Sequence, residues 1–278
     1  MNDPRLTLMR DGVAALSLLG QVRADRYEPT TVMRCVLSAA AIRKAPDARS
    51  EQQDQLIFGE AFNVLSSANG FAFGQARRDG YVGYVDQAAL IKDVIEPSHW
   101  ISVLRTYAFA EPDIKASISG LYTLNSLVAV EETEGRFVRV RDAGWIVATH
   151  LAPIGEYASD PAAVAQCFLN APYQWGGRES AGLDCSGLVQ QALYACGRAA
   201  PRDTDMQAAA LGRPIDRNAL ARNDLVFWRG HVGIMLDETR MLHANAHHMM
   251  TAIEPVDEAI SRIRAAGAGE PTAFKRLS

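Results

Sequence analysis

The stretch Leu183-Asp184-Cys185-Ser186-Gly187-Leu188-Val189 decides the fold of this 278-residue chain, because it places a cysteine where a helix is expected to begin. Apolar residues recur beyond it at helical spacing, and Gly197 and Pro201 end the pattern. Free backbone N–H groups and the helix dipole at such a position favour a thiolate. We therefore expect Cys185 to be a nucleophile; the alternative is an inert, buried cysteine in front of a helix.

A general base is expected from His231, on a separate segment that follows the cysteine by 46 residues. Side chains alternate between the faces of a strand. If a loop of three residues is centred on Glu238, Gly233 pairs with His243, and His231 lies on the same face as a diagonal neighbour. We therefore predict that His243 orients the imidazole of His231. His247 would lie on the same face of the strand and is the alternative.

Three groups of motifs, in order along the chain, carry a resemblance to a known family. They are Pro172-Tyr173-Gln174-Trp175-Gly176-Gly177; Leu183 to Val189; and Asp224-Leu225-Val226-Phe227-Trp228, His231-Val232-Gly233-Ile234 and Met241-Leu242-His243-Ala244. Over about residues 157–278 they resemble the signature of the NlpC/P60 cysteine peptidases. The resemblance implies a papain-like core and hydrolysis of amide bonds in bacterial cell-wall peptides, and it too places the third polar residue at His243.

The preceding residues are predicted to form two small β domains. Short strands bounded by turns recur in a degenerate internal repeat, with Gly70 and Gly135 at matching hairpin turns. Gly59-Glu60 and the run 79–85 resemble a bacterial SH3-type domain. We expect an α+β protein with an N-terminal extension (1–30), two SH3-like β-barrels (31–95 and 96–155) and the papain-like domain (157–278). A linker is expected over 151–159, and Asp160 is expected to cap the helix that follows.

In the expected mechanism, Cys185 attacks a substrate carbonyl carbon while His231 holds the thiolate as an ion-pair partner and later protonates the leaving amine. The resemblance places an active-site hydroxyl at Tyr173, although a core aromatic is the alternative. Trp175 is expected to line the cleft rather than to pack against it. Trp228 is expected in the core.

The substrate is a further inference from resemblance. Tandem SH3-like domains combined with Pro201-Arg202-Asp203 resemble murein-peptide recycling enzymes that cleave γ-D-glutamyl–diaminopimelate bonds in peptides with a free N-terminal L-Ala. That resemblance implies that Glu60 and Tyr81 join Asp184 in holding the substrate ammonium, and that Ser186, Asp203 and Thr204 also contact substrate. The alternatives are a solvated glutamate, a helix cap at Asp184, and an ordinary loop or cap at 203–204.

Composition narrows the remaining classes. A net charge of −4 without a Lys/Arg cluster argues against nucleic-acid binding. Four scattered cysteines give neither a disulfide framework nor a metal-site spacing, so no metal or other cofactor is expected. Neither a convincing signal peptide nor a membrane span is recognised, which predicts a cytoplasmic protein. The oligomeric state is not predicted.

Two rival functions stay open at this level. One is a thiol amidase or acyltransferase on the same papain-like core. The other is a non-catalytic protein that binds wall peptides through its β domains, although such a protein has no need of Cys185, His231 and His243 together.

Overall fold

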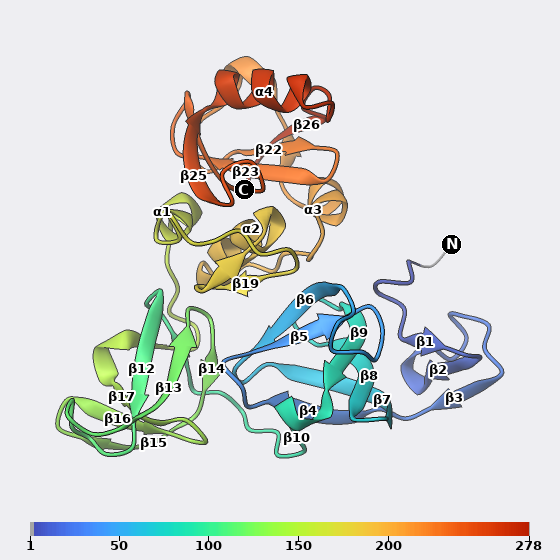
Figure 1. Ribbon diagram of the computed structural model, residues 1–278, viewed down its shortest axis with the longest axis vertical. Coiled ribbons are helices and arrows are strands. Elements are labelled where there is room, and N and C mark those ends of the chain that lie inside the picture. Colours follow the sequence, from blue (N-terminus) through green and yellow to red (C-terminus); the bar gives the residue numbers. More distant parts are fainter. Residues whose placement is uncertain (1–2, 278) are drawn as a thin grey trace. The chain divides into compact units, whose positions relative to one another are not determined.

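The computed structural model describes residues 3–277 and divides into two compact units, residues 1–154 and 155–278. The first is built almost entirely of strands and the second mixes helices with a sheet, which makes the protein α+β as expected (Figure 1). Within residues 3–277, no helix combines the length and apolar character that crossing a membrane requires.

The first unit opens with a small sheet and continues into the first β-barrel. The small sheet has the order β1-β2-β3, with β1 (Met9–Arg10), β2 (Val13–Ala15) and β3 (Arg26–Glu28), and η1 (Leu16–Leu18) follows β2. The barrel sheet has the order β10-β4-β7-β8-β9-β5-β6. Its elements are β4 (Thr31–Cys35), β5 (Ala39–Arg43), β6 (Gln52–Ile57), β7 (Ala61–Ala68), β8 (Phe71–Ala76), β9 (Val82–Asp86), η2 (Gln87–Ala89) and β10 (Leu90–Ile91).

The second barrel consists of two sheets, ordered β14-β11-β18 and β13-β12-β17-β16-β15. Its elements are β11 (His99–Ile101), β12 (Arg105–Phe109), β13 (Ile118–Thr123), β14 (Leu127–Val128), β15 (Val130–Glu134), β16 (Phe137–Val140), β17 (Gly144–Val147), η3 (Ala148–His150) and β18 (Leu151–Pro153). Gly70 and Gly135 have φ of +80° and +57° between paired strands, which confirms the predicted hairpin turns.

The two barrels meet where Phe58 enters the core of the second barrel, its ring centroid 4.7 Å from that of Tyr122. Gly59 makes this approach possible: its φ is +84°, and a Cβ there would lie 1.9 Å from the carbonyl oxygen of Leu127. Only glycine fits both conditions. The next residue, Glu60, is held at this junction.

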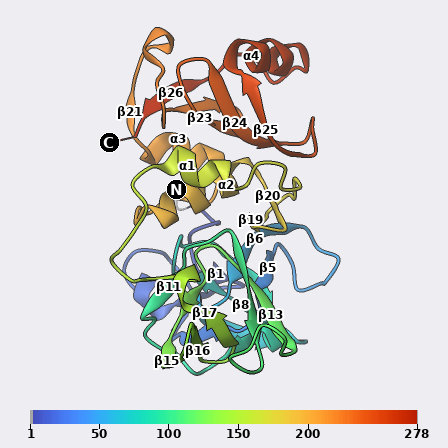
Figure 2. The ribbon, with the colours of Figure 1, turned by 90° about the vertical axis from the view of Figure 1, so that its left-hand side faces the viewer.

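The second unit is a six-stranded sheet with helices on both faces (Figures 1 and 2). The sheet order is β21-β26-β22-β23-β24-β25, with β21 (Arg213–Pro214), β22 (Leu225–Trp228), β23 (His231–Met235), β24 (Arg240–Asn245), β25 (Met250–Pro255) and β26 (Ala273–Arg276). A ribbon of β19 (Arg178–Glu179) and β20 (Gly182–Leu183) precedes the second helix. Figure 2 shows α4 (Val256–Ala265) on one face and α1 (Pro161–Gln166), α2 (Cys185–Ala195) and α3 (Thr204–Ala210) on the other; η4 (Arg217–Ala219) precedes β22.

The structure confirms the predicted helix cap at the start of this unit and corrects the predicted linker before it. Asp160 accepts hydrogen bonds from the N–H groups of Ala162 and Ala163 and caps α1, as predicted. The predicted linker begins too early, however, because Leu151–Pro153 is a strand that pairs with β11. Alternation of half-buried residues there is too short to distinguish a strand from a linker by pattern alone.

Candidate active site

Cys185 is the first residue of α2, as the sequence predicts, and the helix ends at Ala195 with Gly197 in a left-handed conformation. The side chain is only 6% exposed. Its Sγ lies 3.9 Å from the hydroxyl of Thr204 and 4.0 Å from the carbonyl oxygen of Gly230. The thiol therefore lies beside the main chain immediately before His231.

The expected low pKa of this thiol is wrong for the resting site. Burial raises the pKa of Cys185 to about 11, and the charge of Asp184 adds to the effect; the backbone N–H of Val232, the hydroxyl of Thr204 and the charge of Arg202 oppose it more weakly. Removal from water disfavours the thiolate more than the start of the helix favours it. Burial therefore favours a neutral thiol over the predicted resting ion pair.

His231 and His243 contact each other directly. His231 is the first residue of β23 and His243 lies in β24; Nε2 of His231 is 2.8 Å from Nδ1 of His243. The register agrees with the prediction, since Ile234 pairs with Leu242 and Leu236 donates to the carbonyl of Arg240 across the loop.

The imidazole of His231 is neutral at rest. Burial lowers the pKa of His231 to about 3, with further lowering by His243. Its ring centroid lies 5.7 Å from that of Trp228, which is 2% exposed in the core, as expected. The space above Gly233 is filled by Met241, whose Sδ would lie 2.4 Å from a Cβ at that position.

Two residues that sequence reasoning missed complete this chain of contacts. Nε2 of His243 is 2.6 Å from Oε2 of Glu254 in β25, and Arg262 of α4 donates to both oxygens of Glu254, at 3.0 and 2.5 Å. Burial alone would raise the pKa of Glu254, but the hydrogen bonds from His243 and Arg262 outweigh it and hold that pKa well below its usual range. The face of β25 on which Glu254 lies depends on the turn before that strand, where Met249 has a φ of +53°. A methionine rarely adopts this left-handed conformation, so the sequence does not predict it.

Asp184 and Arg202 form a buried ion pair under the start of α2. The two side chains are 6% and 1% exposed, and Arg202 donates to both carboxylate oxygens at 3.0 and 2.6 Å. The carboxylate also accepts from the N–H groups of Gly176 and Gly187, so it caps the helix and holds the preceding loop. Ser186 donates to Asp184 and accepts from Arg202. These contacts favour the capping alternative for Asp184; its contact with substrate stays a prediction.

The structure also describes the other predicted site residues of this unit. Burial, followed by the charges of Cys185 and Asp184, raises the pKa of Tyr173, which keeps its phenol protonated beside the site. Trp175 is 60% exposed, which favours a surface role over packing. Asp203 is half-buried and precedes α3 without capping it through its side chain. Within residues 3–277, no group of three His, Cys, Asp or Glu residues is placed to hold a metal ion.

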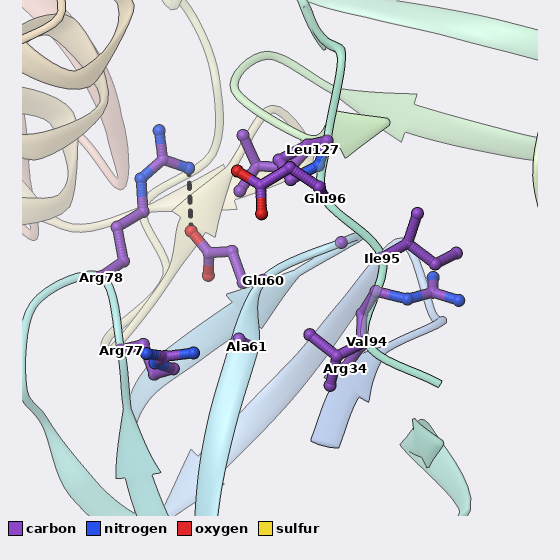
Figure 3. A pocket seen from close by; sticks show the side chains of 11 residues that line it. Arg34, Glu60, Ala61, Arg77, Arg78, Val94, Ile95, Glu96 and Leu127 are labelled. Atoms are coloured by element: carbon purple, nitrogen blue, oxygen red, sulfur yellow. Dashed lines mark hydrogen bonds and ion pairs between the residues drawn. The ribbon is translucent and has the colours of Figure 1, made fainter. Parts of the chain in front are cut away.

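Glu60 and Tyr81 belong to the first unit. Glu60 is not solvated: it is 1% exposed, accepts from Arg78 at 2.9 Å and from the N–H of Ile57 at 3.1 Å. It lines a cavity of about 300 Å³ at the junction of the two barrels, where Glu96 also lies (Figure 3). Tyr81 is 3% exposed in the core of the first barrel, which favours packing over contact with a ligand. Their roles in binding substrate stay predictions.

Comparison with known proteins agrees with this geometry. The model of the NlpC/P60 family matches residues 170–269, and that of the bacterial dipeptidyl-peptidase Sh3 domain matches residues 42–90. The chain is 23% identical over 237 residues to dipeptidyl-peptidase 6 of Lysinibacillus sphaericus, covering 77% of this chain and 87% of the relative. It is 29% identical over 221 residues to the gamma-D-glutamyl-L-lysine dipeptidyl-peptidase of Bacillus subtilis (strain 168), covering 69% and 72%.

A solved structure shares most of this fold. The crystal structure of an NlpC/P60 family protein from Bacillus cereus ATCC 10987 matches 88% of this chain and 99% of its own, with a TM-score of 0.75 and 17% identity. This likeness supports the fold alone. The two family models, together with the residues gathered around Cys185, identify residues 170–269 as an NlpC/P60 domain and residues 42–90 as a bacterial SH3 domain.

Proposed function

We propose that this cysteine peptidase of the NlpC/P60 type hydrolyses the γ-D-glutamyl–L-diamino acid bond of cell-wall peptides that have a free N-terminal L-Ala. The observation that carries the proposal is a buried thiol at the start of α2 next to His231, whose far nitrogen is 2.8 Å from His243. A nucleophile, a base and a residue that orients the base are the three parts that thiol-based acyl transfer requires.

The reaction begins from the neutral pair. As Sγ of Cys185 attacks the carbonyl carbon, its proton passes to His231, and a tetrahedral oxyanion forms. His231 then gives this proton to the leaving amine, the C–N bond breaks and a thioester remains on Cys185. Water attacks the thioester with His231 again as base, which releases the acid and restores the thiol.

Burial of both groups in their neutral forms suits this sequence. The charges form only during attack, where fixed dipoles in a site shielded from water stabilise them most effectively. The N–H of Cys185 at the helix start and the protonated phenol of Tyr173 are the donors we assign to the oxyanion. The N–H of Val232 stabilises the negative sulfur.

The choice of bond rests on the relatives and on the first unit. The Bacillus subtilis relative is named for the γ-D-glutamyl-L-lysine bond, and both that relative and the one from Lysinibacillus sphaericus are named dipeptidyl-peptidases. A dipeptidyl-peptidase acts next to a free amino terminus, and a buried carboxylate such as Glu60 is a suitable partner for an ammonium group. A peptide whose amine is blocked would bring no second cation to that carboxylate, which is already paired with Arg78.

Mass spectrometry of peptide digests tests the proposal. The purified protein should release free diamino acid from L-Ala-γ-D-Glu-meso-diaminopimelate or its L-Lys counterpart, and Cys185→Ala should release none. N-acetylation of the L-Ala should slow cleavage. Glu60→Gln should lower kcat/KM for the free amine about tenfold or more, because a charge-assisted contact is lost; Glu96→Gln, in the same cavity, is the matched control (Figure 3).

Two results would contradict parts of the proposal. If the wild type cleaves neither peptide, the assignment of the γ-D-glutamyl–L-diamino acid bond is wrong. The thiol amidase alternative would then be favoured. Equal rates on free and acetylated peptides, with Glu60→Gln unchanged, would remove the role of the ammonium group.

A further inference from the structure

We propose that Glu254, fixed by Arg262, sets the tautomers of His243 and His231 in series, so that in the resting site the nitrogen of His231 nearest Cys185 is the unprotonated one. This inference rests on the proposed function only in that it explains how the base is made ready. It makes Glu254 a positioning residue that acts through His243, with no direct contact to the substrate.

The first step is the state of Glu254. Arg262 donates to Oε1 through Nε at 3.0 Å and to Oε2 through a terminal nitrogen at 2.5 Å, a two-pronged pairing that holds the carboxylate ionised and in one orientation. The His243 side chain is completely buried and its Nε2 lies 2.6 Å from Oε2. An ionised carboxylate only accepts, so Nε2 of His243 carries the proton.

The second step follows from the chemistry of a neutral imidazole. Such a ring has one donor and one acceptor nitrogen. Burial lowers the pKa of His243, although Glu254 opposes this, so the ring is neutral. With Nε2 protonated, Nδ1 of His243 is the acceptor, and Nε2 of His231, 2.8 Å away, must be the donor. Since His231 is also neutral, its Nδ1 is left with a free lone pair.

The third step connects that lone pair to the thiol. Nδ1 is the ring nitrogen closer to its own main chain, and Sγ of Cys185 lies against this main chain, 4.0 Å from the carbonyl oxygen of Gly230 and beside the N–H of Val232. The free nitrogen is therefore on the side where the proton must be accepted. If the tautomers were reversed, Nδ1 of His231 would carry a proton and could not accept another.

The same chain supports the charged state that follows. When His231 takes the proton of the thiol, its Nε2–H still donates to His243, whose Nε2–H donates to Glu254. Besides the effect of His243 on His231, the groups that act on the two rings are His248 beyond β24, Glu254 of β25 and Arg262 of α4. Of the two charged groups that act on His231, only Glu254 favours its protonated form, while Arg262 opposes it.

Histidine-labelled protein observed by ¹⁵N NMR gives the direct test, because protonated and bare nitrogens of a neutral imidazole have well-separated shifts. The wild type should show Nε2–H and bare Nδ1 for both His231 and His243. Glu254→Gln keeps the size of the side chain but can offer a donor or an acceptor, so the bare-nitrogen signal of His231 should divide between Nδ1 and Nε2. A protonated Nδ1 of His231 in the wild type would overturn the proposal.

Enzyme kinetics and matched variants add the functional readout. Glu254→Gln should lower kcat at least tenfold with little change in KM, because the carboxylate that fixes the tautomer of the catalytic histidine is lost. Glu254→Asp should recover part of that activity. The control is Asp224→Asn, which removes another buried carboxylate, one that pairs with Arg276 at 2.9 and 2.8 Å; it should leave both tautomers unchanged.

The two levels of the argument can fail separately. If the wild type cleaves no cell-wall peptide, the proposed substrate falls, while the NMR result still decides the tautomers without any substrate. If Glu254→Gln leaves both the tautomers and kcat unchanged, the positioning role falls, whatever peptide the enzyme cleaves.

Discussion

Replacing Arg202 with Met removes the counter-charge of Asp184 while keeping most of the side-chain volume. Breaking a buried ion pair by removing one partner costs about 3–5 kcal/mol, because the other charge is left uncompensated. Asp184 keeps three further donors, the N–H groups of Gly176 and Gly187 and the hydroxyl of Ser186, so we expect the lower end of that range, about 3 kcal/mol.

Native-state hydrogen exchange measured by mass spectrometry suits this prediction because it reports on each region of the chain separately. Peptides covering α2 should exchange about 100-fold faster in Arg202→Met, since each 1.4 kcal/mol is a factor of ten. The double variant Asp184→Asn with Arg202→Met should recover part of the loss, because no buried charge is then left alone. Arg264→Met is the control, since Arg264 and its partner Glu270 are 59% and 57% exposed.

Unchanged protection of α2 in Arg202→Met would refute this reasoning. It would mean that the charge of Asp184 is compensated in some other way, and that the carboxylate is available to a substrate cation. A double variant less stable than the sum of the two single changes would refute it as well, because it would leave no favourable coupling between the charges.

Two further predictions concern the same unit. The unfolded state binds protons at the ordinary pKa of histidine, about 6.5, whereas burial holds that of His231 at about 3, so stability should fall as the pH drops from about 6.5 toward 3. His231→Gln should flatten this slope in urea unfolding measured at several pH values, and an unchanged slope would contradict the assignment. Gly187→Ala would place a Cβ 2.3 Å from the carbonyl oxygen of Gly177, a backbone atom that has no rotamer to relieve the contact. It should cost about 1–3 kcal/mol in thermal unfolding, and full retention of stability would show that the loop moves freely.

The residues that act locally could be placed from the sequence alone. Asp160 and Pro161 predict the start of α1, and the helical spacing of apolar residues after Cys185 predicts both ends of α2. Caps, glycines and helical spacing depend on neighbours a few positions away, so the sequence states them directly. The pairing of β23 with β24 belongs to the same class, because a short loop fixes the register of a hairpin.

The residues that act across the fold could not be placed in this way. Glu254 reaches His243 only through the pairing of β24 with β25, and Arg262 reaches Glu254 only because α4 packs on that face of the sheet. Arg202 was noticed for its motif, yet its contact with Asp184 depends on the chain folding back after α2. The prediction of a low pKa for Cys185 failed for the same reason. The start of a helix is a local feature, whereas burial is produced by the whole domain.

The Asp184–Arg202 and Glu254–Arg262 ion pairs have the same effect on the site. Asp184 opposes ionisation of the thiol and Glu254 favours a charged His231, but each carboxylate is joined by an arginine that acts in the opposite direction. The net charge placed beside the thiol and the imidazole is therefore small, which agrees with a site that rests as neutral thiol and neutral imidazole. What the pairs supply is orientation: Asp184 holds the loop and the helix start around the sulfur, and Glu254 holds the imidazole chain in one tautomer. A buried ion pair is a weak source of net stability but a good source of geometric specificity, and a reaction whose charges exist only during attack depends on the latter.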